Sequence, residues 1–130
     1  MAQNEELSRL MMMAEQYKEQ LNQIDMQISY MQQAKNDYNR AKITIKKLSE
    51  SKKDSDVLLP LGGGSYIDAN VKDSAKILVD IGAGYIAEKK SDSAIKKIEN
   101  RIKDLDKHLE RLQEIRKKKK KEASDVYQKA

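Results

Sequence analysis

The fold is decided by residues 7–31, which read LSRLMMMAEQYKEQLNQIDMQISYM. Apolar residues alternate in steps of three and four along this run, and Tyr38 and Ile45 keep the register further on. A strict seven-residue repeat keeps an apolar seam facing a partner helix, whereas an ordinary surface helix carries a broader stripe. The run therefore predicts a coiled-coil helix. Its seam residues are Leu7, Leu10, Ala14, Tyr17, Leu21, Ile24, Ile28 and Met31.

A second run repeats the rhythm. Its seam residues are Ile95, Ile98, Ile102, Leu105, Leu109 and Leu112, followed after a gap by Ala123, Val126 and Ala130. We expect one helix over residues 4–50 and a second that begins at Ser91 or Asp92, where a capping side chain is favourable, and continues almost to Ala130. If the two pair antiparallel, residues whose numbers add to about 142 face each other. Four cations interrupt the seam and are expected to loosen its distal third: Lys35, Lys42, Arg116 and Lys119.

Between the two runs the apolar period changes from seven to two, over residues 57–89. This alternation predicts four short strands, with glycine-rich turns at residues 62–64 and 82–84 and a polar link at residues 72–75. Isolated hairpins are marginal in water, so the sheet needs helices packed over it or strands from other subunits. The expected subunit-joining positions are Val57, Leu59, Leu61, Ile67, Ala69, Val71, Ile77, Val79, Ile81 and Tyr85.

Composition fits long helices with thin apolar seams rather than a compact globule, and with the four strands the expected fold class is α+β. Apolar residues make up 38% of the sequence and charged residues 36%, and tyrosine is the only aromatic type. The absence of cysteine excludes disulfides and thiolate metal sites and is typical of a reducing cytosol. There is no apolar run of about 20 residues and no secretory signal pattern at the beginning. We therefore expect an unprocessed, cytoplasmic protein.

The strand segment resembles a known family. Residues 57–67 read VLLPLGGGSYI and residues 77–89 read ILVDIGAGYIAEK, and the two together are similar to the double-hairpin segment of the prefoldin alpha subunit class. The order helix, two hairpins, helix covers essentially the whole chain. Beta-class subunits carry one hairpin, so the second hairpin indicates the alpha class. The resemblance implies a single prefoldin-like domain over residues 1–130.

The resemblance also implies a function. Two alpha and four beta subunits would form a hexamer in which the hairpins build a double β-barrel platform and six coiled coils project from it. Prefoldins are ATP-independent holdases whose coiled-coil tips capture unfolded client proteins and deliver them to a group II chaperonin. The two ends of this chain would form the tip. No enzymatic activity and no cofactor is implied.

Consecutive apolar residues near the start of the first helix are the strongest candidate for client contact. At 100° per residue, residues 10–13 sweep most of the helix surface, so one seam cannot cover them all. Met11 and Met12 should face outward, and methionine suits contact with many unlike partners. The alternative is a locally broadened seam with no binding role. The predicted client-binding tip is Leu7, Leu10, Met11, Met12, Met13, Val126 and Tyr127.

Residues 116–130 carry seven basic and two acidic side chains, so this segment accounts for the whole net charge of +5. Lys117, Lys118, Lys119, Lys120 and Lys121 are consecutive, and are expected either to form a solvated face or to steer acidic clients or an acidic chaperonin surface electrostatically. Two rival functions remain open: a coiled-coil scaffold without chaperone activity, and an arm that binds nucleic acid through the basic run. His108 has no partner ligand in the sequence, and the glycines at 62–64 lack the residues of a phosphate loop. We therefore expect no metal site, no catalytic residue and no membrane partner.

Overall fold

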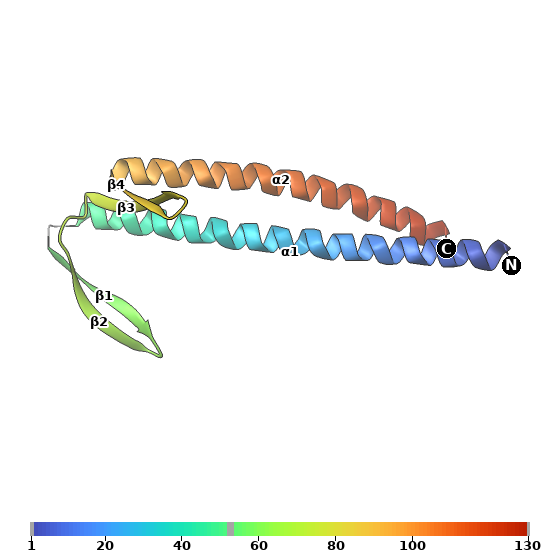
Figure 1. Ribbon diagram of the computed structural model, residues 1–130, viewed down its shortest axis with the longest axis horizontal. Coiled ribbons are helices and arrows are strands. Elements are labelled where there is room, and N and C mark those ends of the chain that lie inside the picture. The colour runs from blue at the N-terminus through green and yellow to red at the C-terminus, as the bar shows by residue number, and fades with distance from the viewer. Residues whose placement is uncertain (1, 52–53, 130) are drawn as a thin grey trace. The chain divides into compact units, whose positions relative to one another are not determined.

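The computed structural model describes residues 2–51 and 54–129. Its elements follow the order α1 (Ala2–Glu50), β1 (Ser55–Gly62), β2 (Ser65–Val71), β3 (Lys76–Gly82), β4 (Tyr85–Lys90) and α2 (Ser91–Lys129), as Figure 1 shows. This confirms the predicted order of helix, two hairpins and helix. The predicted seam residue Ala130, together with Lys52 and Lys53 of the predicted linker, lies outside the described residues.

The chain divides into two compact units. We call Met1–Asn36 with Lys103–Ala130 the helical unit, and Asp37–Ile102 the hairpin unit. The helical unit holds the first part of α1 and the last part of α2. The hairpin unit holds the last turns of α1, the four strands and the first turns of α2.

In the helical unit, the two helix segments run antiparallel along an apolar seam. Ala14, Ile24, Leu109, Ala123 and Val126 are all buried there. The other predicted seam residues of this unit are half-buried, except Leu7, which is exposed near the beginning of α1. The heptad rule therefore identified the seam correctly, because a buried stripe needs only the right repeat and a partner helix with the same repeat.

Each of the four seam cations has an acceptor on the opposite helix. Lys35, Arg116 and Lys119 find theirs in the helical unit, and Lys42 finds its own in the hairpin unit. The pairs are Lys35–Asp106, Lys42–Glu99, Arg116–Asp25 and Lys119–Gln20. The two cations expected to loosen the distal third, Arg116 and Lys119, therefore each contact a polar side chain of α1. Exposed ion pairs contribute about 0–1 kcal/mol each, so their main effect is to fix the register of the helices.

The core of the hairpin unit is a small cluster of Ile45, Ala94 and Ile98. Ala94 is fully buried between Ile45 of α1 and Ile98 of its own helix. Partly buried residues from both helices and from β3 surround the cluster; they are Tyr38, Ala41, Ile77, Val79, Ile95 and Ile102. Tyr38 and Ile102, which were predicted to lie near each other, both pack against this cluster. No residue of β1 or β2 belongs to the cluster.

The strands form two separate two-stranded antiparallel sheets, β1 with β2 and β3 with β4. Each hairpin turns through two residues with positive φ, Gly63 and Gly64 in the first and Ala83 and Gly84 in the second. That pattern is the type I′ turn, whose twist matches the strands that flank it. The pairing register shifts between Pro60 and Gly62 and again between Asp80 and Gly82. The simple alternation expected from the sequence therefore breaks at one residue in each hairpin, because a bulge places an extra residue there.

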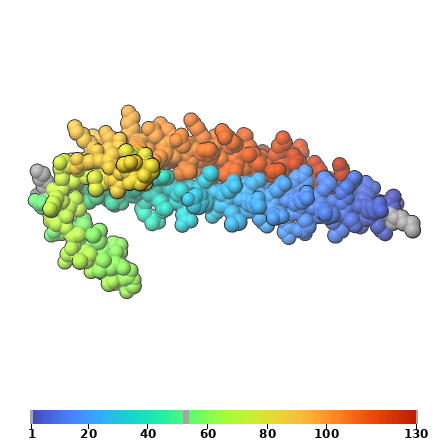
Figure 2. All heavy atoms as spheres, viewed as in Figure 1, coloured from blue at the N-terminus to red at the C-terminus, as the bar shows by residue number. Residues whose placement is uncertain are grey.

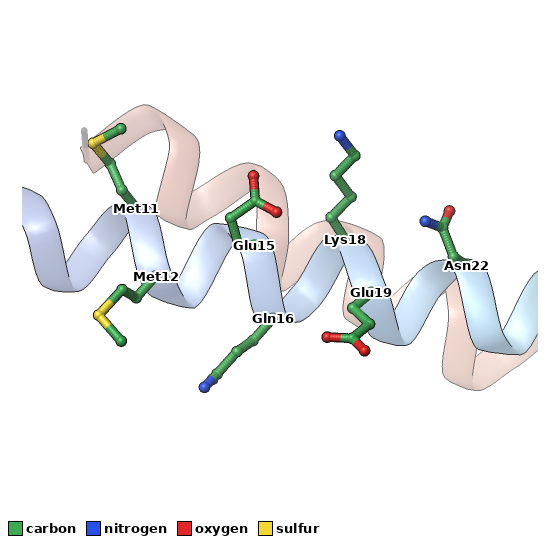
Figure 3. A pocket seen from close by; sticks show the side chains of 7 residues that line it. All are labelled: Met11, Met12, Glu15, Gln16, Lys18, Glu19 and Asn22. Atoms are coloured by element: carbon green, nitrogen blue, oxygen red, sulfur yellow. The ribbon is translucent and has the colours of Figure 1, made fainter.

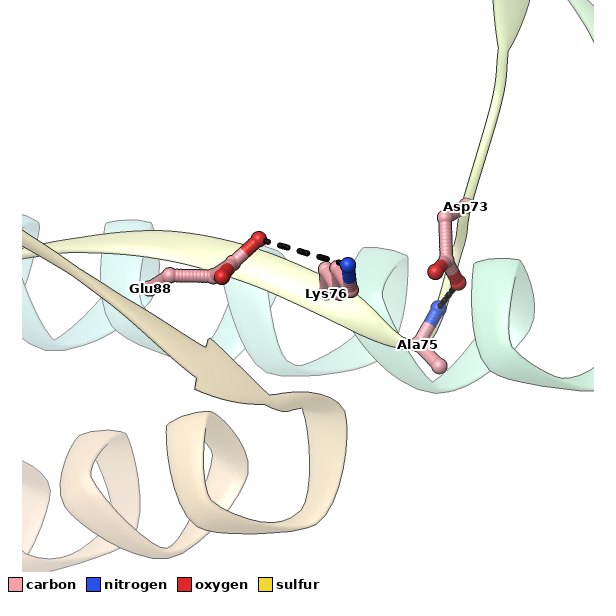
Figure 4. A network of polar contacts seen from close by, with 4 residues as sticks. All are labelled: Asp73, Ala75, Lys76 and Glu88. Carbon is pink, nitrogen blue, oxygen red and sulfur yellow. Dashed lines mark hydrogen bonds and ion pairs between the residues drawn. The ribbon is translucent and has the colours of Figure 1, made fainter.

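A compact link joins the two hairpins and the start of α2. The Asp73 carboxylate accepts a hydrogen bond from the Ala75 N–H at 3.0 Å, and the Ala75 carbonyl accepts one from the Ser91 N–H at 2.9 Å. Lys76 on β3 and Glu88 on β4 face each other diagonally across the second hairpin, with Nζ and Oε1 3.9 Å apart (Figure 4). These contacts position α2 directly after β4, so that it begins at Ser91 as predicted.

Candidate functional site

The first three turns of α1 carry an exposed apolar surface, which we call the tip surface: Leu7, Met11, Met12 and Met13. Met11 is 59% exposed and Met12 is 67% exposed, while Leu10 beside them is half-buried toward the seam. The geometry follows from the helix, because four consecutive residues point in four directions and the seam can cover only one of them. The predicted outward orientation of Met11 and Met12 is confirmed.

Shallow grooves with mixed linings run over this surface. One is lined from α1 alone, by Met11, Met12, Glu15, Gln16, Lys18, Glu19 and Asn22 (Figure 3). In Figure 3, the two thioethers leave α1 in different directions and are followed along the helix by charged and amide groups. A second groove involves Leu7, Leu10 and Lys129, so that residues of α1 and α2 share it. Apolar groups among polar ones suit an unstructured polypeptide, which presents both kinds of side chain.

The two tip residues predicted on α2 have different environments. Val126 is 7% exposed and belongs to the buried seam, so it does not contribute to the tip surface in the isolated chain. Its neighbour Tyr127 is exposed. From the sequence, Val126 could be either a buried seam residue or an exposed tip residue, because it occupies a seam position of the repeat close to the end of the described helix.

The first hairpin has an apolar face that is partly open to solvent. The pairs Val57 with Ala69 and Leu59 with Ile67 place four apolar side chains on that face. Leu59 and Ile67 are each about half exposed, and Leu58 and Tyr66 on the opposite face are more exposed still. Figure 2 shows the segment of these two strands, in green, as a thin layer of atoms. Large apolar groups are therefore exposed on both faces of one thin hairpin, which is typical of an interaction surface.

The second hairpin uses its two faces differently. Ile77 and Val79 pack against the cluster of α1 and α2 in their own unit, rather than lying free for another subunit. The exposed apolar residues of this hairpin are Leu78, Ile81, Tyr85 and Ile86. The predicted subunit-joining positions did not include Leu58, Leu78 and Ile86, because only one face of each strand was assigned to subunit contact. The signal was present, since all three interrupt what would otherwise be polar positions.

The basic run of α2 divides into two sets. Arg116 and Lys119 turn toward α1 and bind Asp25 and Gln20. The remaining lysines, Lys117, Lys118, Lys120 and Lys121, are exposed. Four ammonium groups therefore project into solvent beside the seam, as a field that salt can screen.

Three pKa shifts accompany these contacts. Burial, followed by the nearby Glu122 carboxylate that accepts its hydrogen bond, raises the pKa of Tyr17 above its ordinary value. The hydrogen bond to Asp25 raises the pKa of Arg116. Burial and then the neighbouring charges of Arg101 and Lys89 lower the pKa of Lys97. Burial contributes to all three shifts, and it opposes the rise in the pKa of Arg116.

Among residues 2–51 and 54–129, no three His, Asp or Glu side chains gather in a way that could hold a metal ion. His108 is exposed, and the glycines of residues 62–64 form a bulge and a turn. Within the same described part of the chain, neither helix is apolar enough over a sufficient length to cross a bilayer. The tip surface and the hairpin faces are exposed apolar surfaces of the described residues.

The family model of the prefoldin subunit matches residues 17–130. The chain belongs to the prefoldin subunit family. It is 33% identical to prefoldin subunit alpha of Methanosarcina barkeri over 99 residues, which cover 76% of this chain and 66% of that relative. It is 34% identical to prefoldin subunit alpha of Methanoculleus marisnigri over 101 residues, which cover 78% of this chain and 67% of the relative. The matched segments thus span about two thirds of the length of these curated relatives.

A solved structure of filamentous prefoldin from Methanocaldococcus jannaschii superposes with a TM-score of 0.59 and covers 97% of this chain and 98% of its own. The sequence identity of that pair is 22%, so the likeness shows the prefoldin fold. The resemblance noted in the two glycine-turned hairpins is therefore confirmed, and so is the fold class of coiled-coil helices with two central β-hairpins.

Proposed function

We propose that this chain is the alpha-type subunit of an ATP-independent prefoldin holdase, which captures non-native proteins with its tip surface and delivers them to a group II chaperonin. In this proposal residues 1–130 act as one prefoldin-like domain in the cytoplasm, and the protein catalyses no reaction. The observation that carries the proposal is the exposure of Met11 and Met12 in a unit that does not contain the hairpins. Binding and assembly then use separate surfaces.

Assembly with other subunits is supported by the uncovered hairpin faces. Leu59 and Ile67 leave half of their surface open, and Leu58 and Leu78 leave more. A two-stranded sheet with apolar side chains on both faces is marginal alone and has unpaired edges, so strands from other chains would cover and extend it. The partners that fit are single-hairpin beta subunits, four of them with two copies of this chain in a hexamer.

Client capture is supported by the chemistry of the tip surface. Thioether side chains are flexible and polarizable, and they adapt to apolar groups of different shape. Several tips on one platform raise the effective concentration for a bound client, so that each contact can be weak while the assembly still retains it.

The four exposed lysines at residues 117, 118, 120 and 121 support an electrostatic role next to capture. Their field would speed encounter with acidic clients or with an acidic chaperonin surface more than it would deepen affinity. Lys119 is expected to contribute less, since it already donates to Gln20.

Co-expression with a beta-class prefoldin subunit tests the assembly, and light scattering coupled to size exclusion measures it. We expect one complex of two chains of this protein with four of the partner. A well-folded monomer at micromolar concentration that ignores the partner would contradict the proposal. An assembly that forms but does not suppress aggregation of an unfolded test protein would favour the scaffold function instead. Tight binding of nucleic acid at physiological salt would favour the nucleic-acid arm.

A further inference from the structure

Most residues of the tip surface are methionines. The chain has six methionines and no cysteine, so thioethers are its only sulfur groups. Three of the four residues of the tip surface are methionines, and the side chains of Met11 and Met12 are open to solvent. A thioether that is reachable by a peroxide is oxidised to a sulfoxide, which is polar and chiral where the original side chain was apolar.

We propose that Met11 and Met12 are a reversible oxidation site, at which peroxide weakens the capture of non-native proteins and sulfoxide reduction restores it. This inference rests on the proposed holdase function. In the forward step a sulfur lone pair attacks a peroxide oxygen. An S–O bond forms and the O–O bond breaks. The sulfur is oxidised by two electrons, and the second oxygen of the hydrogen peroxide leaves as water. In the reverse step a dithiol reductase is oxidised to its disulfide, and the sulfoxide oxygen leaves as water.

Oxidation at the sulfurs of Met11 and Met12 should alter the tip surface without altering the packed seam. Neither residue belongs to the buried seam, and the buried seam residues of the helical unit, Ala14, Ile24, Leu109, Ala123 and Val126, contain no sulfur. A sulfoxide in a packed core disrupts the fold, whereas one on an exposed face changes only what that face can bind. Oxidation at Met11 and Met12 is therefore compatible with an intact coiled coil, which separates a modification site from damage.

The same helix provides an internal control. Met26 is 72% exposed, which is as open as Met12, but it lies two heptads further along α1, outside the tip surface. Peroxide should oxidise Met26 as fast as Met11 and Met12, and Met31 in the half-buried seam more slowly. Only the sulfoxides at the tip surface should change client capture.

The test uses the assembled complex of this chain with its partner subunits, treated with hydrogen peroxide or left untreated. Peptide mass spectrometry follows sulfoxide formation at each methionine, and binding of a fluorescent unfolded polypeptide follows capture. A partial loss of the apolar contribution at each of the two methionines, about 1.4 kcal/mol in total, predicts about tenfold weaker binding after treatment. Added methionine sulfoxide reductases of both stereospecificities should restore it, while circular dichroism stays unchanged throughout.

Two variants assign the effect, and each is compared with its own untreated sample. M26L should bind like wild type before treatment and lose the same tenfold after it. M11L/M12L should show little further loss on treatment, whatever its starting affinity, and it controls for oxidation of the partner subunits. An equal loss in treated M11L/M12L, or unchanged wild-type capture with Met11 and Met12 fully oxidised, would overturn the proposal. If the untreated complex captures nothing, the holdase function itself fails, and with it the inference that rests on it.

Discussion

Assembly through the first hairpin should fail when its open apolar face is made polar. Leu59 and Ile67 are cross-strand partners, each with about half of its surface still accessible. Full burial of such a side chain contributes about 1.5–3 kcal/mol, so covering the remaining half contributes about 1 kcal/mol per residue. L59S/I67S should therefore weaken each hairpin contact by about 2 kcal/mol, or about 30-fold in the dissociation constant.

The assay is light scattering with size exclusion over a dilution series of the co-expressed complex. Wild type should remain assembled at concentrations where L59S/I67S dissociates. M11S/M12S is the matched control, because it removes a similar exposed apolar surface from the helical unit and should leave assembly unchanged. Circular dichroism should show the same helix content in all three proteins, since neither hairpin residue belongs to the Ile45–Ala94–Ile98 cluster. Unchanged assembly of L59S/I67S would refute the reasoning about the hairpin face.

Three further outcomes follow from the packing and the charges. Ile98→Ala removes a buried side chain of the Ile45–Ala94–Ile98 cluster and should lower the free energy of unfolding by about 2–4 kcal/mol, as measured by urea denaturation. The control is Ile43→Ala, a change at an exposed residue. A loss under about 0.5 kcal/mol for Ile98→Ala would contradict the role of this cluster as the core of the hairpin unit. Burial and the nearby Glu122 carboxylate raise the pKa of Tyr17 in the folded state, so stability should fall above about pH 10 more steeply in wild type than in Tyr17→Phe. Parallel slopes would contradict the raised pKa of Tyr17. Replacing the lysines at residues 117, 118, 120 and 121 by glutamine should slow association with an acidic client at low salt and have little effect at high salt, as measured by stopped flow. Equal association rates of variant and wild type at low salt would show that these lysines form only a solvated surface.

The helices and the number of strands could be predicted because their signals are local. The heptad repeat fixes which residues face a partner helix, Ser91 marks the beginning of α2, and glycines with positive φ mark both turns. The bulges could not be predicted, because a one-residue register shift leaves the alternation of apolar residues almost unchanged. Leu61 and Ile81 were therefore placed on the faces of Leu59 and Val79, although the register shifts next to them.

The candidate site was predictable in part for a similar reason. Exposure of Met11 and Met12 follows from helix geometry alone, since the seam cannot cover four consecutive positions. Val126 could not be assigned, because a seam position near a helix end can be buried or open. The inward packing of Ile77 and Val79 depends on how β3 meets the helices, which no local pattern encodes. The acceptors of the seam cations depend on the exact register of the two helices. The expectation that facing residue numbers add to about 142 gave this register only approximately.

The most direct test of the central claim is the suppression of aggregation by the assembled complex, measured with a chemically unfolded test protein at equal complex concentration. M11S/M12S/M13S should assemble normally and lose most of the suppression, while M26S, changed at an equally exposed methionine of the same helix, should keep it. Full suppression by the triple variant would contradict the account that this chain captures non-native proteins through its tip surface.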